Sequence, residues 1–187
     1  MSLALKTGAV LALLAASPPP KRTLQQFLAD RTMFEPGRMM IVDEANKRAH
    51  AGDMRAPDTE SLKKLEAAAG KLPADYRAFV TTADGGNLRL PAASGRNYGV
   101  SLFFYPLKDV LQLREEELVS GLKGAVPIAS DNGEIVLFFD VDGALSKGRF
   151  AVFSYETSAG KATTESHYLG ANLTDVLNAL AAGTPLY

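Results

Sequence analysis

The order of the predicted helices and strands along this chain constrains its fold more than any other feature of the sequence. Two segments with helical spacing of apolar residues come first, at 58–70 and 73–83. Segments rich in aromatic and β-branched residues then dominate, interrupted by one helical segment at 106–118, and a helical segment follows at 172–183. Helices, then mainly strands, then a helix is typical of an α+β domain rather than of repeated βαβ units. We therefore expect one sheet of about five to six mostly antiparallel strands packed with helices.

End signals support these helices. Asp58 is placed to cap the first helix, and Gly70 ends it. Pro73 suits the start of the second helix, because its missing N–H would be unpaired there in any case. Asn172 is a cap for the last helix, with Asp175 in its first turn. The apolar faces of these three helices are formed by Leu62, Leu65, Ala69, Tyr76, Phe79, Val80, Leu173, Val176, Leu177 and Leu180.

The N-terminal region allows two interpretations. Residues 3–16 can form an apolar helix that packs on the domain and ends at the prolines 18–20. They can also be read as a signal peptide, with Ala15, Ala16 and Ser17 as small residues at the cleavage site. The apolar stretch is too short for a transmembrane span, which needs about 20 residues. We favour the helix and a cytoplasmic protein; a signal peptide would place it in the periplasm.

The domain organisation follows from this choice. We expect an N-terminal helical extension over residues 1–57 that packs on a domain of residues 58–187. Short helices are predicted within the extension at 23–30 and 43–51, and a linker at 52–57.

Charge and cysteine content exclude several kinds of function. The chain has 20 basic and 21 acidic residues, a net charge of −1, and no cysteine. Balanced charge argues against a nucleic-acid or membrane-surface binder, since neither partner would be attracted by a general positive field. A chain without cysteine has no disulfide, no thiolate nucleophile and no cysteine-based zinc site. The two histidines, His50 and His167, each lack a nearby ligand partner. We therefore expect no metal and no cofactor.

One motif resembles a catalytic one. An apolar strand that ends in Asp140, Val141, Asp142 and Gly143 resembles the first motif of haloacid-dehalogenase-type phosphatases, in which one aspartate attacks phosphorus. However, the position of the expected threonine holds Ala144, and only 45 residues follow Asp142, with no clear acidic pair to hold magnesium. A strand that ends in an Asp-Gly turn explains the same residues. We expect no catalytic residues, and keep a phosphatase-like site at Asp140 and Asp142 as the least favoured alternative.

Several short motifs together resemble one family. They are Leu72–Phe79 (Leu-Pro-Ala-Asp-Tyr-Arg-Ala-Phe), Asp84–Asn87 (Asp-Gly-Gly-Asn), Leu102–Leu107, the pair Pro127–Asp131 and Val136–Asp140, and the closing segment Leu173–Leu180. In this order they resemble the SUKH superfamily (Smi/Knr-type) over about residues 58–182. Asp84 stands where that family usually has asparagine, and its common tryptophans are absent. The resemblance implies the α+β fold and a non-catalytic immunity protein that neutralises a cognate bacterial toxin; a scaffold or regulatory binding module, as in the cell-wall regulators of that family, is the alternative.

Two groups of polar residues are candidates for binding a protein partner. Glu115, Glu116 and Glu117 are expected on the outer face of the helix at 106–118, where they could speed capture of a basic toxin or simply be solvated. The other candidates lie in turns that flank apolar segments: Asp84, Asn87, Asp131, Asn132 and Glu134. The partner is expected to be a protein, with no nucleic acid and no membrane.

Overall fold

The computed structural model describes residues 20–36, 58–91, 99–131 and 134–187 of the chain. The helices predicted at 3–16 and 43–51 and the linker at 52–57 lie outside these residues. The described helices are α1 (Leu24–Ala29), α2 (Thr59–Ala69), α3 (Ala74–Ala83), α4 (Leu107–Glu115), α5 (Ala162–Glu165) and α6 (Leu173–Ala181). The strands are β1 (Phe34–Pro36), β2 (Gly86–Leu90), β3 (Val100–Phe104), β4 (Val126–Ser130), β5 (Ile135–Asp140), β6 (Ala151–Glu156) and β7 (Ser166–Gly170).

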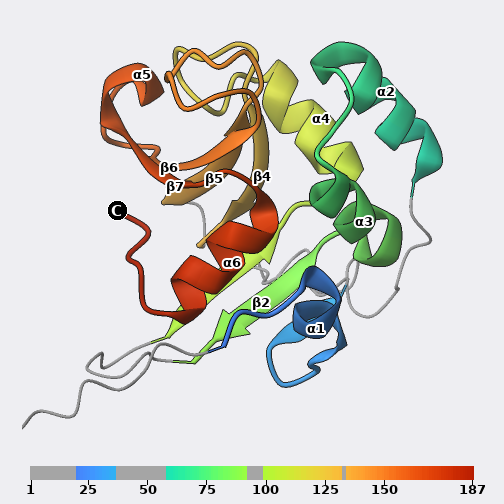
Figure 1. The fold of residues 1–187 in the computed structure, drawn as a ribbon. Coiled ribbons are helices and arrows are strands. Elements are labelled where there is room, and N and C mark those ends of the chain that lie inside the picture. The colour runs from blue at the N-terminus through green and yellow to red at the C-terminus, as the bar shows by residue number, and fades with distance from the viewer. Residues whose placement is uncertain (1–19, 37–57, 92–98, 132–133) are drawn as a thin grey trace, which may run out of the picture.

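The strands form one seven-stranded sheet in which each strand is hydrogen-bonded to its neighbours in the chain (Figure 1). Every neighbouring pair is antiparallel. The α+β class is confirmed, with more strands than the five to six expected. The additional strands are β1 and β2. The first has three residues, and the second begins at Gly86, shortly after the end of α3.

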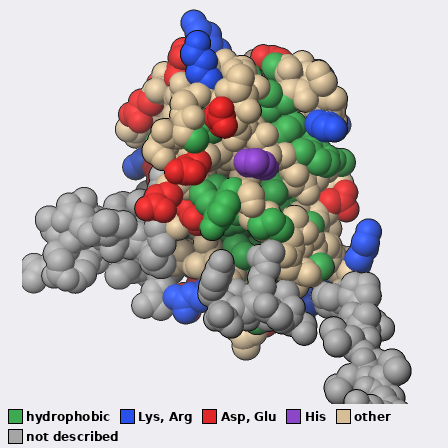
Figure 2. Space-filling view, turned by 90° about the vertical axis from the view of Figure 1, so that its left-hand side faces the viewer, with side chains coloured by type: hydrophobic (Ala, Val, Ile, Leu, Met, Phe, Trp, Pro, Cys, Tyr) green, Lys and Arg blue, Asp and Glu red, His purple; other side chains and the backbone are tan. Residues whose placement is uncertain are grey.

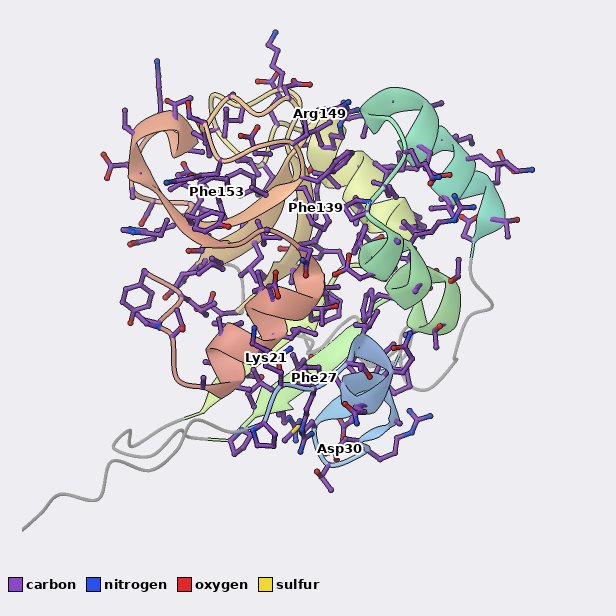
Figure 3. All side chains as sticks on the ribbon, viewed as in Figure 1. Lys21, Phe27, Asp30, Phe139, Arg149 and Phe153 are labelled. Carbon is purple, nitrogen blue, oxygen red and sulfur yellow. The ribbon has the colours of Figure 1, made fainter. Side chains whose placement is uncertain are left out.

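Both faces of the sheet are covered. On one face, α3 and α6 pack over a large cluster of buried side chains, the main core, which includes Tyr76, Phe79, Leu88, Phe104, Leu137, Phe139, Val152 and Leu177. On the other face, α5 and the loops that follow α4 and β5 cover a smaller second core, formed by Val119, Ala125, Val136, Phe138, Ala151, Phe153, Tyr155 and Ala162. Successive residues of β6 alternate between the two cores, because side chains of a strand point to opposite faces. Figure 3 labels one member of each core, Phe139 and Phe153.

The predicted helix caps are confirmed. The Asp58 carboxylate accepts hydrogen bonds from the backbone N–H groups of Glu60 and Ser61, both at 3.1 Å, at the start of α2. The Asn172 side chain accepts one from the Asp175 N–H at 2.9 Å, at the start of α6. These bonds satisfy N–H groups that have no partner within the helix. The end signals read from the sequence therefore set where these helices begin.

The helix predicted at 106–118 ends earlier, at Glu115. Glu117 adopts a left-handed backbone conformation with φ 51°. Its N–H bonds to the Arg114 carbonyl, and the Leu118 N–H bonds back to the Leu113 carbonyl, as in a Schellman end. Leu118 then packs against the second core instead of extending the apolar face of α4. Burial in a different core therefore ends the helix here.

Of the N-terminal helical extension expected over residues 1–57, the structure describes residues 20–36, which contain a helix and a short strand. The short helix at 23–30 is present as α1, but β1 follows it and pairs with β2 as the first strand of the sheet. This segment is also tied to α6: the Arg22 N–H donates to the Asn178 side chain at 2.7 Å, and the Asn178 amide donates to the Arg22 carbonyl at 2.8 Å. Phe27 and Phe34 are buried in the main core. Residues 20–36 are therefore part of the domain.

In the described part of the chain, no helix combines the length and the apolar character that crossing a bilayer requires.

Candidate functional site

Asp84 and Asn87, two of the residues predicted to bind a partner, are both buried in the structure. Asp84 ends α3 in a left-handed conformation and is only 8% exposed. Its carboxylate accepts a hydrogen bond from the Leu107 N–H at 2.9 Å and so joins the end of α3 to the start of α4. Burial raises the pKa of the Asp84 carboxyl above its ordinary value. Asn87 is 3% exposed within β2, because that strand begins directly after the turn.

The acidic run is exposed, but its geometry differs from the prediction. Only Glu115 belongs to α4; Glu116 is the residue at its end, and Glu117 lies beyond it in the left-handed turn. The three side chains therefore do not share one helix face. The Gln112 amide donates a hydrogen bond to the Glu116 carboxylate at 2.8 Å, and Glu117 forms an ion pair with Lys123 at 3.8 Å. Two of the three carboxylates, those of Glu116 and Glu117, therefore already have partners within the protein.

A second acidic group lies at one end of the four strands β4 to β7. Asp131 closes the turn between β4 and β5, where its side chain accepts a hydrogen bond from the Ile135 N–H at 2.7 Å. Glu134 is exposed beside it, and Asn132 lies outside the described residues. The pairing of Ile135 with Glu156 and of Tyr155 with Ser166 places Glu156 and Glu165 at the same end of the sheet. We call these four residues, Asp131, Glu134, Glu156 and Glu165, the acidic hairpin end.

Sequence reasoning missed two members of this group, Glu156 and Glu165. Each lies at the boundary of a strand-like segment, but only the strand register shows that they lie at the same end of the sheet as Glu134. All three glutamates are exposed. Among the described residues, no ion pair within 4.0 Å involves any of them, so their charge is not compensated by a bonded cation.

Exposed aromatic side chains lie near the acidic hairpin end. Tyr168 on β7 is 46% exposed and Tyr187 at the C-terminus is 69% exposed. The Tyr168 ring packs edge-on against Phe153 at 5.6 Å, and the Lys147 ammonium lies 5.7 Å from its centre. Figure 2 shows hydrophobic side chains gathered near the described histidine, His167, with acidic side chains along one side of them. An apolar centre with a charged border is typical of protein-binding surfaces.

The phosphatase-like motif has a structural explanation. Asp140 is 3% exposed, and its two carboxylate oxygens accept hydrogen bonds from the N–H groups of Ala144 at 3.0 Å and Leu145 at 2.7 Å. These bonds close the turn after β5, while Asp142 is exposed. In the parts of the chain that the structure describes, no group of three or more His, Asp or Glu residues is arranged to hold a metal ion. His167 is exposed on β7, and His50 lies outside the described residues.

Comparison with known proteins agrees with this architecture. The family model described as the SMI1 / KNR4 family (SUKH-1) matches residues 56–179. No curated protein matches the chain. The matched region runs from just before α2 into α6 and contains strands β2 to β7. Because this match covers well over half of the 187 residues, the chain belongs to the SMI1 / KNR4 family (SUKH-1).

Proposed function

We propose that this protein is a non-catalytic immunity protein that binds and neutralises a cognate bacterial toxin in the cytoplasm. Family membership supports a binding role, since the resemblance implies toxin neutralisation for bacterial members. The observation that carries the proposal is the acidic hairpin end, where Glu134, Glu156 and Glu165 lie exposed without ion-pair partners among the described residues. Uncompensated negative charge on one surface attracts a basic partner and orients it during encounter.

The exposed aromatic side chains beside these glutamates supply binding affinity, which exposed charge alone does not. Exposed charged groups mainly raise the association rate, whereas buried aromatic anchors contribute most of the affinity of an interface. Tyr168, which follows Ser166 by two residues on β7, and Tyr187 are exposed. In this proposal the glutamates attract the toxin, and the tyrosines become buried in the complex.

The first prediction concerns the negative charge of the acidic hairpin end. Lysine at Glu134, Glu156 and Glu165 together should slow association with the cognate toxin domain, and the effect should shrink as salt rises. Surface-capture kinetics at two salt concentrations measure it. The matched control places lysine at Glu115, Glu116 and Glu117, which changes the net charge equally at another surface, and should slow association less.

Two outcomes would contradict the proposal. One is a wild-type protein that neither binds nor protects cells against that toxin. The other is an equal loss of association rate in both triple variants, which would show that net charge and not the acidic hairpin end is responsible. Mature protein recovered from the periplasm with a start near Ser17 would contradict the cytoplasmic location. Magnesium-dependent phosphatase activity lost in Asp140→Asn would contradict the absence of catalysis.

A further inference from the structure

The last strand of the sheet has an unpaired edge. Among the described strands, β7 pairs with β6 alone. Edge strands in soluble proteins are usually protected against further pairing by a charged side chain, a proline or a bulge. Over Ser166, His167 and Tyr168 this strand has neither charge nor proline, and its pairing with β6 is regular. The register shift comes later, next to Gly170. The first part of β7 can therefore accept another strand.

Apolar surface lies along this edge. Tyr168 and Tyr187 are the large hydrophobic residues that the structure shows as exposed within its described ranges. Tyr187 follows Leu186, whose carbonyl accepts a hydrogen bond from the Ser154 hydroxyl, and Ser154 pairs with His167 across β6 and β7. Both tyrosines therefore lie near β7.

A groove of about 710 Å³ continues from the Gly170 end of the edge. The groove is lined by residues 20–22 and 168–171, by Phe27, Met33 and Pro91, and by residues 175, 178, 179, 181 and 182 of α6 and its end. Figure 3 shows Lys21 and Phe27 beside α6. The lining is mainly apolar, and the volume lies in the range of about 300–1,000 Å³ that is usual for ligand pockets. The groove can therefore take the apolar side chains of an incoming chain.

The opposite end of the edge is acidic. Glu165 directly precedes β7; the strand register places Glu156 beside it on β6, and Glu134 at the same end of the sheet, before β5. The edge is therefore negatively charged at Ser166 and apolar at Gly170. From Glu165 to Ala171 it offers room for about six to seven extended residues, or about 20 Å at about 3.3 Å per residue.

We propose that β7 binds an extended segment of a partner protein as an additional strand, with basic residues beside Glu165 and apolar residues in the groove. This inference rests on the proposed function and adds to it the way in which the partner is bound. Strand addition fits better than a bound helix, because only a strand pairs the free N–H and C=O groups of the edge. Backbone pairing supplies affinity, while the charge gradient along the edge selects the sequence.

The experiment uses the full-length protein and two capped nonapeptides. Each peptide alternates threonine with lysine in one half and with leucine in the other; the two differ only in chain direction. Isotope-labelled protein is titrated with each peptide, and the hydrogen exchange of its backbone amides is measured. One direction should bind and slow the exchange of alternate amides in Ser166–Gly170. Replacing the lysines by glutamate should weaken binding by about tenfold or more. Tyr168→Lys should do the same, whereas Thr81→Lys, on the exposed face of α3, should have no effect.

Three results would overturn strand addition. The first is no change in the exchange of β7 amides at the highest peptide concentration. The second is slow exchange of the β7 amides in the protein without peptide, already at low protein concentration. That result would show that the chain itself covers the edge. The third is protection that rises with protein concentration without peptide, which would identify a second copy as the occupant. Because the peptides are not the toxin, a failure of toxin neutralisation would contradict the proposed function and leave the peptide result standing.

Discussion

Two aspartates, Asp58 and Asp84, show how local surroundings decide the effect of a carboxyl group on stability. Asp58 caps α2, and the hydrogen bonds from the Ser61 hydroxyl and N–H lower its pKa. Asp84 is buried between α3 and α4, and burial raises its pKa despite the hydrogen bond from the Leu107 N–H. The two carboxyl groups should therefore give stability opposite dependences on pH.

Asp84→Asn should raise the free energy of unfolding at neutral pH. The raised pKa in the folded state means that ionised Asp84 costs stability, and that this cost appears as pH rises through the folded-state pKa. Asparagine removes the charge, keeps an acceptor for the Leu107 N–H, and tolerates the left-handed backbone with φ 34°. Urea unfolding at about pH 7 and about pH 4 should show the gain at the higher pH and a smaller difference at the lower.

Asp58→Asn is the matched control. Its lowered pKa means that ionised Asp58 stabilises the fold above the unfolded-state pKa, and that this stability is lost as pH falls through the folded-state pKa. The variant should therefore be less stable than wild type at neutral pH. If Asp84→Asn lost stability at neutral pH as well, the attraction between the charged carboxylate and the start of α4 would outweigh the cost of its burial.

At the scale of elements, the pairing of β1 with β2 depends on a residue without a side chain. Gly86 has φ 146°, and a Cβ atom there would lie 2.7 Å from the Glu35 carbonyl oxygen and 2.8 Å from the Phe34 ring. Neither β1 nor the Phe34 ring beneath it could keep its position. The glycine pair after α3 therefore does more than end a helix, because its second member lets β1 approach the sheet.

Gly86→Ala should destabilise the protein by more than the backbone strain of about 1–3 kcal/mol alone. Gly148→Ala is the control, since Gly148 also has a positive φ, of 93°, but its Cβ would meet no atom within 4 Å. Chemical denaturation of both variants measures the difference. Equal losses in the two would show that β1 adjusts freely and that its close approach to Gly86 contributes nothing.

At the scale of the whole molecule, the domain extends beyond the part that matches the family. Leu24, Phe27 and Phe34 are each at most 3% exposed and belong to the main core, although all three precede the matched region 56–179. The Phe34 ring lies edge-on to Phe79 at 5.8 Å. The N-terminal segment thus covers a part of the main core that the matched region does not cover by itself.

Three chain lengths should separate the contributions of the N-terminal residues. A chain of residues 58–187 should be less stable than one of residues 20–187, because it loses three buried side chains worth about 1.5–3 kcal/mol each before entropy is counted. If residues 3–16 form the predicted helix on the domain, the full chain should be more stable again. Thermal and urea unfolding of the three proteins measure these differences in stability. Equal stability of the two longer chains would contradict the predicted helix.

Local patterns predicted most of the elements. The helix starts at Asp58 and Asn172 and the strand at 135–140 depend on side chains within a few residues of each other, so the sequence shows them directly. The end of α4 could not be predicted in this way, because Leu118 leaves the helix for a core built from distant strands. The three-residue strand β1 has no periodicity of its own and exists only through β2.

The sequence by itself determined the α+β class, the family resemblance and the lack of cysteine chemistry, because these depend on composition, spacing and local hydrogen bonds. Only the tertiary structure decided which polar residues share a surface. It buries Asp84 and Asn87 between elements, and it brings Glu134, Glu156 and Glu165 together across three strands. Antiparallel register places residues side by side that are tens of positions apart in the chain, and that register depends on how the strands pack on the cores.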